Sequence, residues 1–249
     1  MVFIDIHCHI DYFNEEKIEK IIENAKKSKV KIILNASTNP DSIDKTLELA
    51  KKYPEVKATL GIFPIDAIQL SKKELDEQIE KIRKNKDKVL AISEVGIDLK
   101  ESNNLKTQEE IFQKFINLAI ELNKPIIVHS RHAELECIEI LEKSNYKKII
   151  MHCFCGKKKL VERIKNNNWY FSVPTNVNNS EQFQNMIKNI PLSQLFCETD
   201  SPFLHPLKQE NNEPANVLYS YKKIAEIKNI SLEEVEKEIE NNFEKLFLK

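Results

Sequence analysis

Short apolar runs alternate with longer amphipathic segments along the whole chain. The apolar runs have the length and composition of buried strands, and the segments between them place apolar residues at the i, i+3, i+4 and i+7 spacing of a helix. The predicted strands cover residues 2–10, 31–37, 56–62, 88–96, 125–130, 148–154, 169–173 and 195–200. The predicted helices cover residues 15–27, 41–53, 72–84, 108–122, 134–144, 157–167, 180–190, 216–228 and 231–247.

This alternation predicts an α/β fold with a parallel sheet. Successive strand ends are spaced by about 27 residues, which is the length of one βα unit. Eight such units in 249 residues favour a single (β/α)8 TIM-type barrel over residues 1–249, with an extra C-terminal helix at 231–247. A doubly wound open sheet is the alternative, although that fold more often uses a glycine-rich first turn.

Composition excludes several classes of site. The three glycines are too few for a GxGxxG fingerprint, a P-loop or a GxSxG elbow. The net charge of -1 gives no global basic field, so a site for a polyanion would have to be local. No leader-like segment precedes the first strand, no apolar run approaches the ~20 residues of a membrane helix, and the five cysteines form no even framework. We therefore expect a cytoplasmic protein with no membrane association and no obligate protein partner.

The first predicted strand contains the first candidate ligands. In the stretch FIDIHCHID, residues 3–11, the even positions are apolar and the odd positions become polar towards the strand's end. Because alternate residues of a strand share a face, His7 and His9 point the same way. In a barrel, the carboxyl end of each strand opens into the active site, where two such imidazoles can bind one metal ion. Taken alone, the pair is equally compatible with hydrogen-bonded core histidines.

Four other predicted strands end in ionisable groups, which are Glu94, His129, His152 and Asp200. A polar cluster inside an apolar barrel must be paired or bound to metal, and imidazoles with carboxylates suit one or two divalent transition metals. Glu94 could bridge two metals, with Asp200 and the histidines of the first strand completing one site and the other two histidines the second. A metal-activated water would then attack the substrate and Asp200 would accept its proton, which makes Asp200 and Glu94 the candidate catalytic residues.

Six motifs in order along the chain resemble those of one enzyme family. The motifs are DIHCHID (5–11), SEVGID (93–98), VHSR (128–131), HCFCG (152–156), ETDSPFL (198–204) and NEPANV (212–217). As a set, they resemble the TatD family of metal-dependent deoxyribonucleases in the amidohydrolase superfamily. The resemblance implies a TIM-type barrel, a one- or two-metal centre and phosphodiester hydrolysis, typically from the 3′ end of DNA. It places the metal ligands at His7, His9, Glu94, His129, His152 and Asp200. Because no thiolate is among them, Zn²⁺, Mn²⁺ and Mg²⁺ all stay candidates.

Some positions depart from the family pattern. Phe63 stands in GIFP where the family usually has His, so an imidazole on the substrate side is lost. His132 follows HSR where the family usually has Asp, and Cys155 replaces a Ser. Arg131, two residues after His129, is a candidate for binding a substrate phosphate, with a buried ion pair to a loop carboxylate as the alternative.

The favoured function is a metal-dependent hydrolase that acts as a 3′→5′ exodeoxyribonuclease on DNA. One alternative is the same centre cleaving another ester or an amide, such as the ester of a D-aminoacyl-tRNA. A second alternative is a metal-binding protein without catalysis, although a structural metal would need only four ligands.

Overall fold

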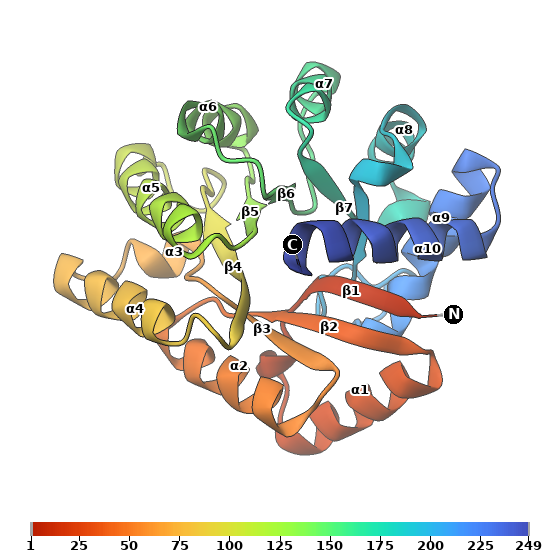
Figure 1. The fold of residues 1–249 in the computed structure, drawn as a ribbon, viewed down its shortest axis with the longest axis horizontal. Coiled ribbons are helices and arrows are strands. Elements are labelled where there is room, and N and C mark those ends of the chain that lie inside the picture. The colour runs from red at the N-terminus through yellow and green to blue at the C-terminus, as the bar shows by residue number, and fades with distance from the viewer. Residues whose placement is uncertain (1, 249) are drawn as a thin grey trace. The chain divides into compact units, whose positions relative to one another are not determined.

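In the computed structural model, which describes residues 2–248, strands and helices alternate along the chain (Figure 1). The strands are β1 (Phe3–Cys8), β2 (Val30–Ala36), β3 (Val56–Leu60), β4 (Val89–Gly96), β5 (Ile126–His129), β6 (Ile149–Met151), β7 (Tyr170–Pro174) and β8 (Leu195–Glu198). The α-helices are α1 (Glu15–Lys27), α2 (Pro40–Lys52), α3 (Pro64–Ala67), α4 (Lys72–Lys84), α5 (Leu105–Leu122), α6 (Glu134–Ser144), α7 (Lys158–Asn166), α8 (Glu181–Asn189), α9 (Leu218–Lys228) and α10 (Leu232–Phe243).

The strands of residues 2–248 belong to one eight-stranded sheet in the order β1 to β8. The pairs β1–β2, β3–β4, β4–β5, β5–β6 and β7–β8 are all parallel. Sequential parallel strands with a helix after each one form the (β/α)8 arrangement predicted from the hydrophobic pattern. The expected extra helix is α10, which begins with the capping box formed by Ser231 and Glu234.

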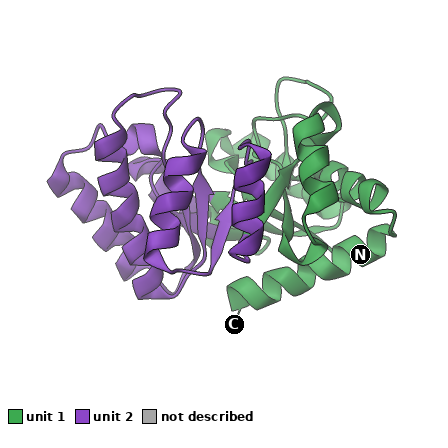
Figure 2. Cartoon of the chain, turned by 90° about the horizontal axis from the view of Figure 1, so that it is seen from above, with its two compact units in different colours: residues 1–35, 49–57, 170–249 green, residues 36–48, 58–169 purple. Residues whose placement is uncertain are grey.

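The described chain divides into two compact units, which Figure 2 shows in different colours. Unit 1 consists of residues 1–35, 49–57 and 170–249, and unit 2 consists of residues 36–48 and 58–169. Unit 1 therefore contains β1, β7 and β8, whereas unit 2 contains β4, β5 and β6. Each unit is built from separate stretches of sequence. The expectation of a single domain over residues 1–249 stays a prediction.

Within unit 1, helix α9 is joined to β1 by both packing and hydrogen bonds. The ring of Tyr221 meets that of Phe3 edge-on, with 4.9 Å between centroids. Its hydroxyl accepts a hydrogen bond from the Ile4 amide at 3.1 Å and donates one to the Ile4 carbonyl at 3.2 Å. All six residues of β1 are buried, so the strand that carries His7 and leads into His9 is held rigidly.

Six strands, which are β1, β2, β3, β5, β6 and β8, end one to three residues earlier than the sequence pattern indicates. For β6 and β8 the backbone explains why. β6 ends at Met151 because Cys153 has a φ of 42°, and β8 ends at Glu198 because Asp200 has a φ of 53°. A left-handed residue cannot continue an extended strand, and for a non-glycine residue it is an uncommon conformation. The chain therefore turns just beyond these strands, where His152 and Asp200 lie.

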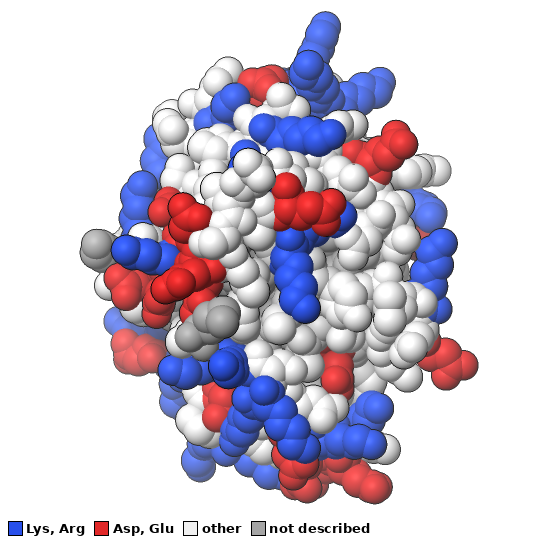
Figure 3. All heavy atoms as spheres, turned by 90° about the vertical axis from the view of Figure 1, so that its right-hand side faces the viewer, with Lys and Arg blue, Asp and Glu red and all other residues white. Residues whose placement is uncertain are grey.

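Within residues 2–248, no helix is both long enough and apolar enough to cross a lipid bilayer. On the face shown in Figure 3, lysine and arginine side chains are interspersed with acidic ones and form no continuous basic surface. That distribution agrees with the net charge of -1.

Candidate metal-binding groups

The unit 1 ligand group consists of His7, His9 and Asp200. His7 lies within β1, His9 follows it, and Asp200 lies just after β8. The Asp200 Oδ1 atom is 3.8 Å from His7 Nε2 and 3.5 Å from His9 Nε2. One ligand atom from each of the three residues lies within 4.8 Å of the others, and the histidines are 0% and 2% exposed. Ligands ~2.1 Å from a tetrahedral ion are about 3.4 Å apart, so these separations fit a divalent metal.

Backbone hydrogen bonds tie the two segments of this group together. The Asp200 amide donates to the His7 carbonyl at 3.0 Å, and the His9 amide donates to the Ser201 carbonyl at 2.7 Å. One step below His7, the carboxylate of Asp5 accepts hydrogen bonds from the Thr199 amide at 2.9 Å and hydroxyl at 2.5 Å. Burial raises the pKa of Asp5 to about 8, although the bonds from Thr199 act in the opposite direction. Asp5 thus anchors the turn that presents Asp200.

Asn212, the first residue of the NEPANV motif, supports the same turn from the other side. It is 1% exposed, and its side-chain amide donates to the Thr199 carbonyl at 2.8 Å and the Thr175 hydroxyl at 2.9 Å. Its backbone carbonyl accepts a hydrogen bond from the Ser201 hydroxyl at 2.7 Å. The motif was noted only for its resemblance to the family. These hydrogen bonds give its first residue, Asn212, a physical role in holding the loop that contains Asp200.

The unit 2 ligand group consists of Glu94, His129 and His152. They lie on β4, at the end of β5 and just after β6. Glu94 Oε1 is 2.9 Å from His129 Nδ1 and 3.7 Å from His152 Nε2. All three side chains are largely buried, because the exposed fraction is 5% for Glu94, 13% for His129 and 5% for His152. One carboxylate oxygen thus faces an imidazole nitrogen of each histidine, which is a donor set suited to a divalent transition metal.

Asp98 was not predicted as a site residue, yet it positions His129. Its Oδ2 atom lies 3.0 Å from His129 Nε2 and accepts a hydrogen bond from Arg131 Nε at 2.8 Å. Oδ1 accepts from the amides of Lys100 at 2.9 Å and Glu101 at 3.1 Å. Burial acts to raise the pKa of Asp98, but the bonds from His129 and Arg131 outweigh it and hold this pKa well below its usual range. The carboxylate fixes the ring so that Nδ1 faces Glu94, as partners of metal-binding histidines do.

Arg131, the candidate phosphate-binding residue, pairs with two carboxylates. Its Nη2 atom lies 2.7 Å from Asp98 Oδ2 and 3.0 Å from Glu101 Oε1. The side chain is nevertheless 41% exposed, and a guanidinium has five N–H donors. The ion pair and a phosphate contact are therefore compatible, and the predicted phosphate contact stays a prediction.

Phe63, which replaces a family histidine, lies against the unit 2 ligand group. Its ring meets that of His129 edge-on, with 4.9 Å between centroids. An aromatic hydrocarbon at this place restricts the ring of His129 by packing and offers no proton or ligand atom. The replacement of a histidine by Phe63 therefore changes a side chain beside the candidate ligands and leaves the ligands themselves unchanged.

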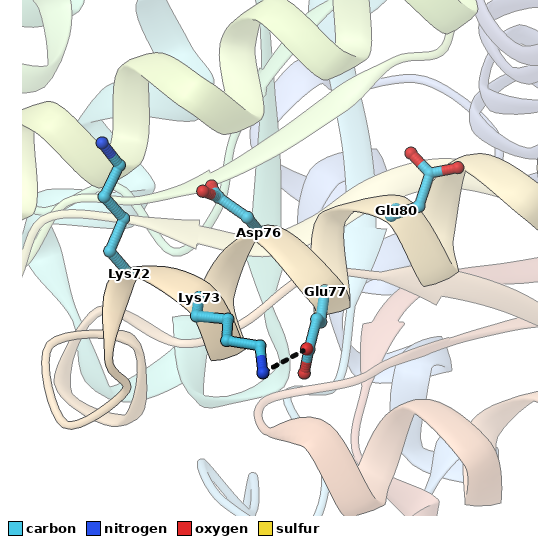
Figure 4. Close-up of a pocket in the computed structure, with 5 residues that line it drawn as sticks. All are labelled: Lys72, Lys73, Asp76, Glu77 and Glu80. Atoms are coloured by element: carbon cyan, nitrogen blue, oxygen red, sulfur yellow. Dashed lines mark ion pairs between the residues drawn. The ribbon is translucent and has the colours of Figure 1, made fainter.

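A surface hollow along α4 contains none of these groups (Figure 4). It is lined by Lys72, Lys73, Asp76, Glu77 and Glu80. Lys73 pairs with Glu77 at 3.8 Å, as neighbours one turn apart on an exposed helix commonly do. All the lining side chains come from one helix and carry no imidazole, so we assign this hollow no function.

Comparison with known proteins gives one consistent family. The family model described as "TatD related DNase" matches residues 4–248. A protein of Methanocaldococcus jannaschii named as an uncharacterized metal-dependent hydrolase is 38% identical over 247 residues, which cover 98% of this chain and 96% of the relative. The human protein named deoxyribonuclease TATDN3 is 32% identical over 259 residues, which cover 99% of this chain and 94% of the relative. The solved structure of YjjV, a TatD homologue from Escherichia coli, covers 99% of this chain and 98% of its own with a TM-score of 0.92 at 24% identity. That likeness confirms the predicted fold class.

Proposed function

Because this chain belongs to the TatD family of metal-dependent hydrolases, we propose that it is an exodeoxyribonuclease that cleaves phosphodiester bonds from the 3′ end of DNA. The observation that carries this proposal is the pair of buried histidine–carboxylate groups at strand ends. The deoxyribonuclease name of the human relative supports DNA as the substrate class.

We propose further that both ligand groups bind the one or two divalent metals the reaction needs, whether Zn²⁺, Mn²⁺ or Mg²⁺. When bound, such metals would activate water and stabilise the negative charge that develops on a phosphodiester. The chain's own task is to hold imidazole nitrogens and carboxylate oxygens in place. Asp5, Asn212 and Asp98 do this through the hydrogen bonds described above.

Asp200 and Glu94 have different parts in the proposed reaction. The side chain of Asp200 is 15% exposed, so a substrate can reach it, and it would accept the proton of the attacking water. Glu94 is 5% exposed and faces two imidazoles, which suits a ligand that stays in place throughout. Arg131 would bind a substrate phosphate with the donors that its ion pair leaves available.

A second candidate function is hydrolysis of another ester or an amide, such as the ester of a D-aminoacyl-tRNA. The observation that favours it is Phe63 beside His129, because the missing imidazole removes a polar group from the substrate side. The same metal chemistry applies to either bond. Both functions agree with the cytoplasmic location that we propose from the sequence.

One substrate panel tests both functions. Purified protein is incubated with Mn²⁺, Mg²⁺ or Zn²⁺ and with 3′-labelled single-stranded DNA, RNA of the same sequence, or D-aminoacyl-tRNA. Release of labelled mononucleotide from DNA, abolished by a chelator and restored by metal, supports the deoxyribonuclease. Deacylation of the tRNA without release from DNA supports the second function and overturns the first.

A further inference from the structure

Two aromatic side chains of unit 1 are exposed beside its ligand group. Tyr12 ends the short helix Ile10–Tyr12 that follows β1, and Phe203 lies in the loop that follows β8. Tyr12 is 49% exposed and Phe203 is 51% exposed. Their ring centroids are 6.1 Å apart and the rings are nearly perpendicular, at 89°. We call this pair the aromatic step.

The aromatic step contacts a predicted metal ligand directly. The ring of Tyr12 stacks on that of His9, with 5.4 Å between ring centroids and 28° between ring planes. The ring of Phe203 meets the same His9 ring edge-on, with 6.4 Å between centroids and 66° between planes. The Tyr12 amide donates to the His9 carbonyl at 3.2 Å, and the Phe203 amide donates to the Asp200 carbonyl at 2.8 Å. Each aromatic residue is thus tied by its backbone to one member of the ligand group, which fixes its distance from the site of reaction.

The exposure of these rings is exceptional within their unit. Phe171, Phe196 and Tyr221 in unit 1 are 0% exposed, as core aromatic side chains should be. Leaving two aromatic rings half in water forgoes the burial that normally stabilises such side chains. Exposed aromatic surface beside a polar site is typical of a binding surface for a ligand with a flat apolar face.

We propose that the aromatic step stacks the nucleobase next to the phosphodiester bond that is hydrolysed. This inference rests on the proposed nuclease function. Every base has a π face, so stacking on aromatic side chains binds nucleic acid with little dependence on sequence. Because the two rings are perpendicular, a base that lies flat on one ring meets the other ring edge-on, and both arrangements are favourable. A phosphodiester without a base would lack this contact.

The test compares two metal-loaded reactions that differ only in one base. Single-stranded DNA ending in a normal 3′ nucleotide is compared with the same strand ending in an abasic 3′ nucleotide. The wild-type protein should show a KM for the abasic strand that is roughly 5- to 150-fold higher, the range expected for stacking of one base. Phe203→Ala should bring that ratio close to one, and Phe203→Trp should keep it.

Controls separate stacking from a disturbed metal site. Leu248→Ala removes a side chain of unit 1 that is 65% exposed and lies in the C-terminal segment Glu244–Leu248, so the ratio should stay as in the wild type. Tyr12→Ala should lower the ratio as Phe203→Ala does, with the metal content per chain measured for each variant. Fluorescence anisotropy with a phosphorothioate-ended strand, which resists cleavage, should show the same loss of affinity.

The outcomes distinguish this inference from the function on which it rests. If the wild type cleaves neither strand with any divalent metal, the nuclease function fails and the inference fails with it. If the wild type cleaves both strands with equal KM, or if Phe203→Ala keeps the wild-type ratio, the nuclease function stands and the aromatic step does not bind a base.

Discussion

Replacing Asp98 by Asn should weaken metal binding by the unit 2 ligand group. Every hydrogen bond that the carboxylate makes is one that it accepts, from His129, Arg131, Lys100 and Glu101. An amide has one accepting oxygen and one donating NH₂ group, so in either orientation the NH₂ would face a pair of donors. Asp98→Asn therefore keeps the volume of the side chain but cannot keep its contacts.

The structure sets the size of the effect. Hydrogen bonds to a charged group contribute about 1.5–3 kcal/mol each. In the variant, the introduced NH₂ group would face two N–H donors, so at least two of these hydrogen bonds are lost. The free energy of unfolding should therefore fall by roughly 2 kcal/mol or more. Losing the partner that orients a metal-binding histidine typically lowers metal affinity by about 10- to 100-fold. The second effect is the one that concerns function.

The assay is a competition titration of metal against a fluorescent chelator, with urea denaturation in parallel. Asp76→Asn is the matched control, because Asp76 is a carboxylate of unit 2 that is 52% exposed and pairs only at the surface with Lys114 at 2.5 Å. The control should bind metal like the wild type. A folded Asp98→Asn variant with unchanged metal affinity would refute the argument that Asp98 positions His129.

Three further changes test other parts of the site. Asn212→Ala removes a buried hydrogen bond to the Thr199 carbonyl, in the turn that holds Asp200, and another to the Thr175 hydroxyl. Unfolding should therefore become easier by roughly 1–3 kcal/mol, and metal should bind less tightly. Asn189→Ala, which removes an exposed hydrogen bond to the Asn185 carbonyl, should do neither, and equal thermal stability of the two variants would contradict this. Arg131→Ala should raise KM for DNA about tenfold or more while metal content stays the same, and an unchanged KM would mean that the guanidinium serves only its ion pairs. Phe63→His should raise kcat on DNA, by up to about 10²-fold if the new imidazole acts in proton transfer, and kcat measured across pH would show no gain if the position only packs.

Alternation along FIDIHCHID explains why half of the site was predictable. A strand places residues two apart on one face regardless of context, so His7 and His9 could be assigned to a common group, and the structure brings both near Asp200. The positions of Glu94, His129 and His152 followed from where the apolar runs of the repeated βα units end, and these three also meet in one group. Their metal binding stays a prediction until it is measured.

The supporting residues could not be predicted in the same way. Asp98 lies in the quoted motif SEVGID, but a carboxylate that orients a ligand looks in sequence like one that is itself a ligand. Its partner His129 is 31 positions away, and only the paired strands β4 and β5 bring the two together. The early end of β6 depended on the left-handed backbone of Cys153, a conformation that residue type alone does not indicate.

The exposed rings of Tyr12 and Phe203 were also hidden in the sequence. Neither was predicted as a site residue, because both lie outside the predicted strands and helices, and the structure shows that both are about half exposed. Hydrophobic periodicity predicts which positions are buried within a strand or helix, but says little about loop residues. The side chains that we propose to select the substrate are therefore the ones that only the three-dimensional structure reveals.

The most direct test of the central claim is the rate at which the wild type and Glu94→Gln release 3′-labelled mononucleotide from single-stranded DNA in Mn²⁺. Glu94 is 5% exposed, and one of its oxygens faces both His129 and His152. The account predicts steady release by the wild type, and loss of most of that rate together with at least one equivalent of metal in the variant. Equal rates for the two proteins would contradict it.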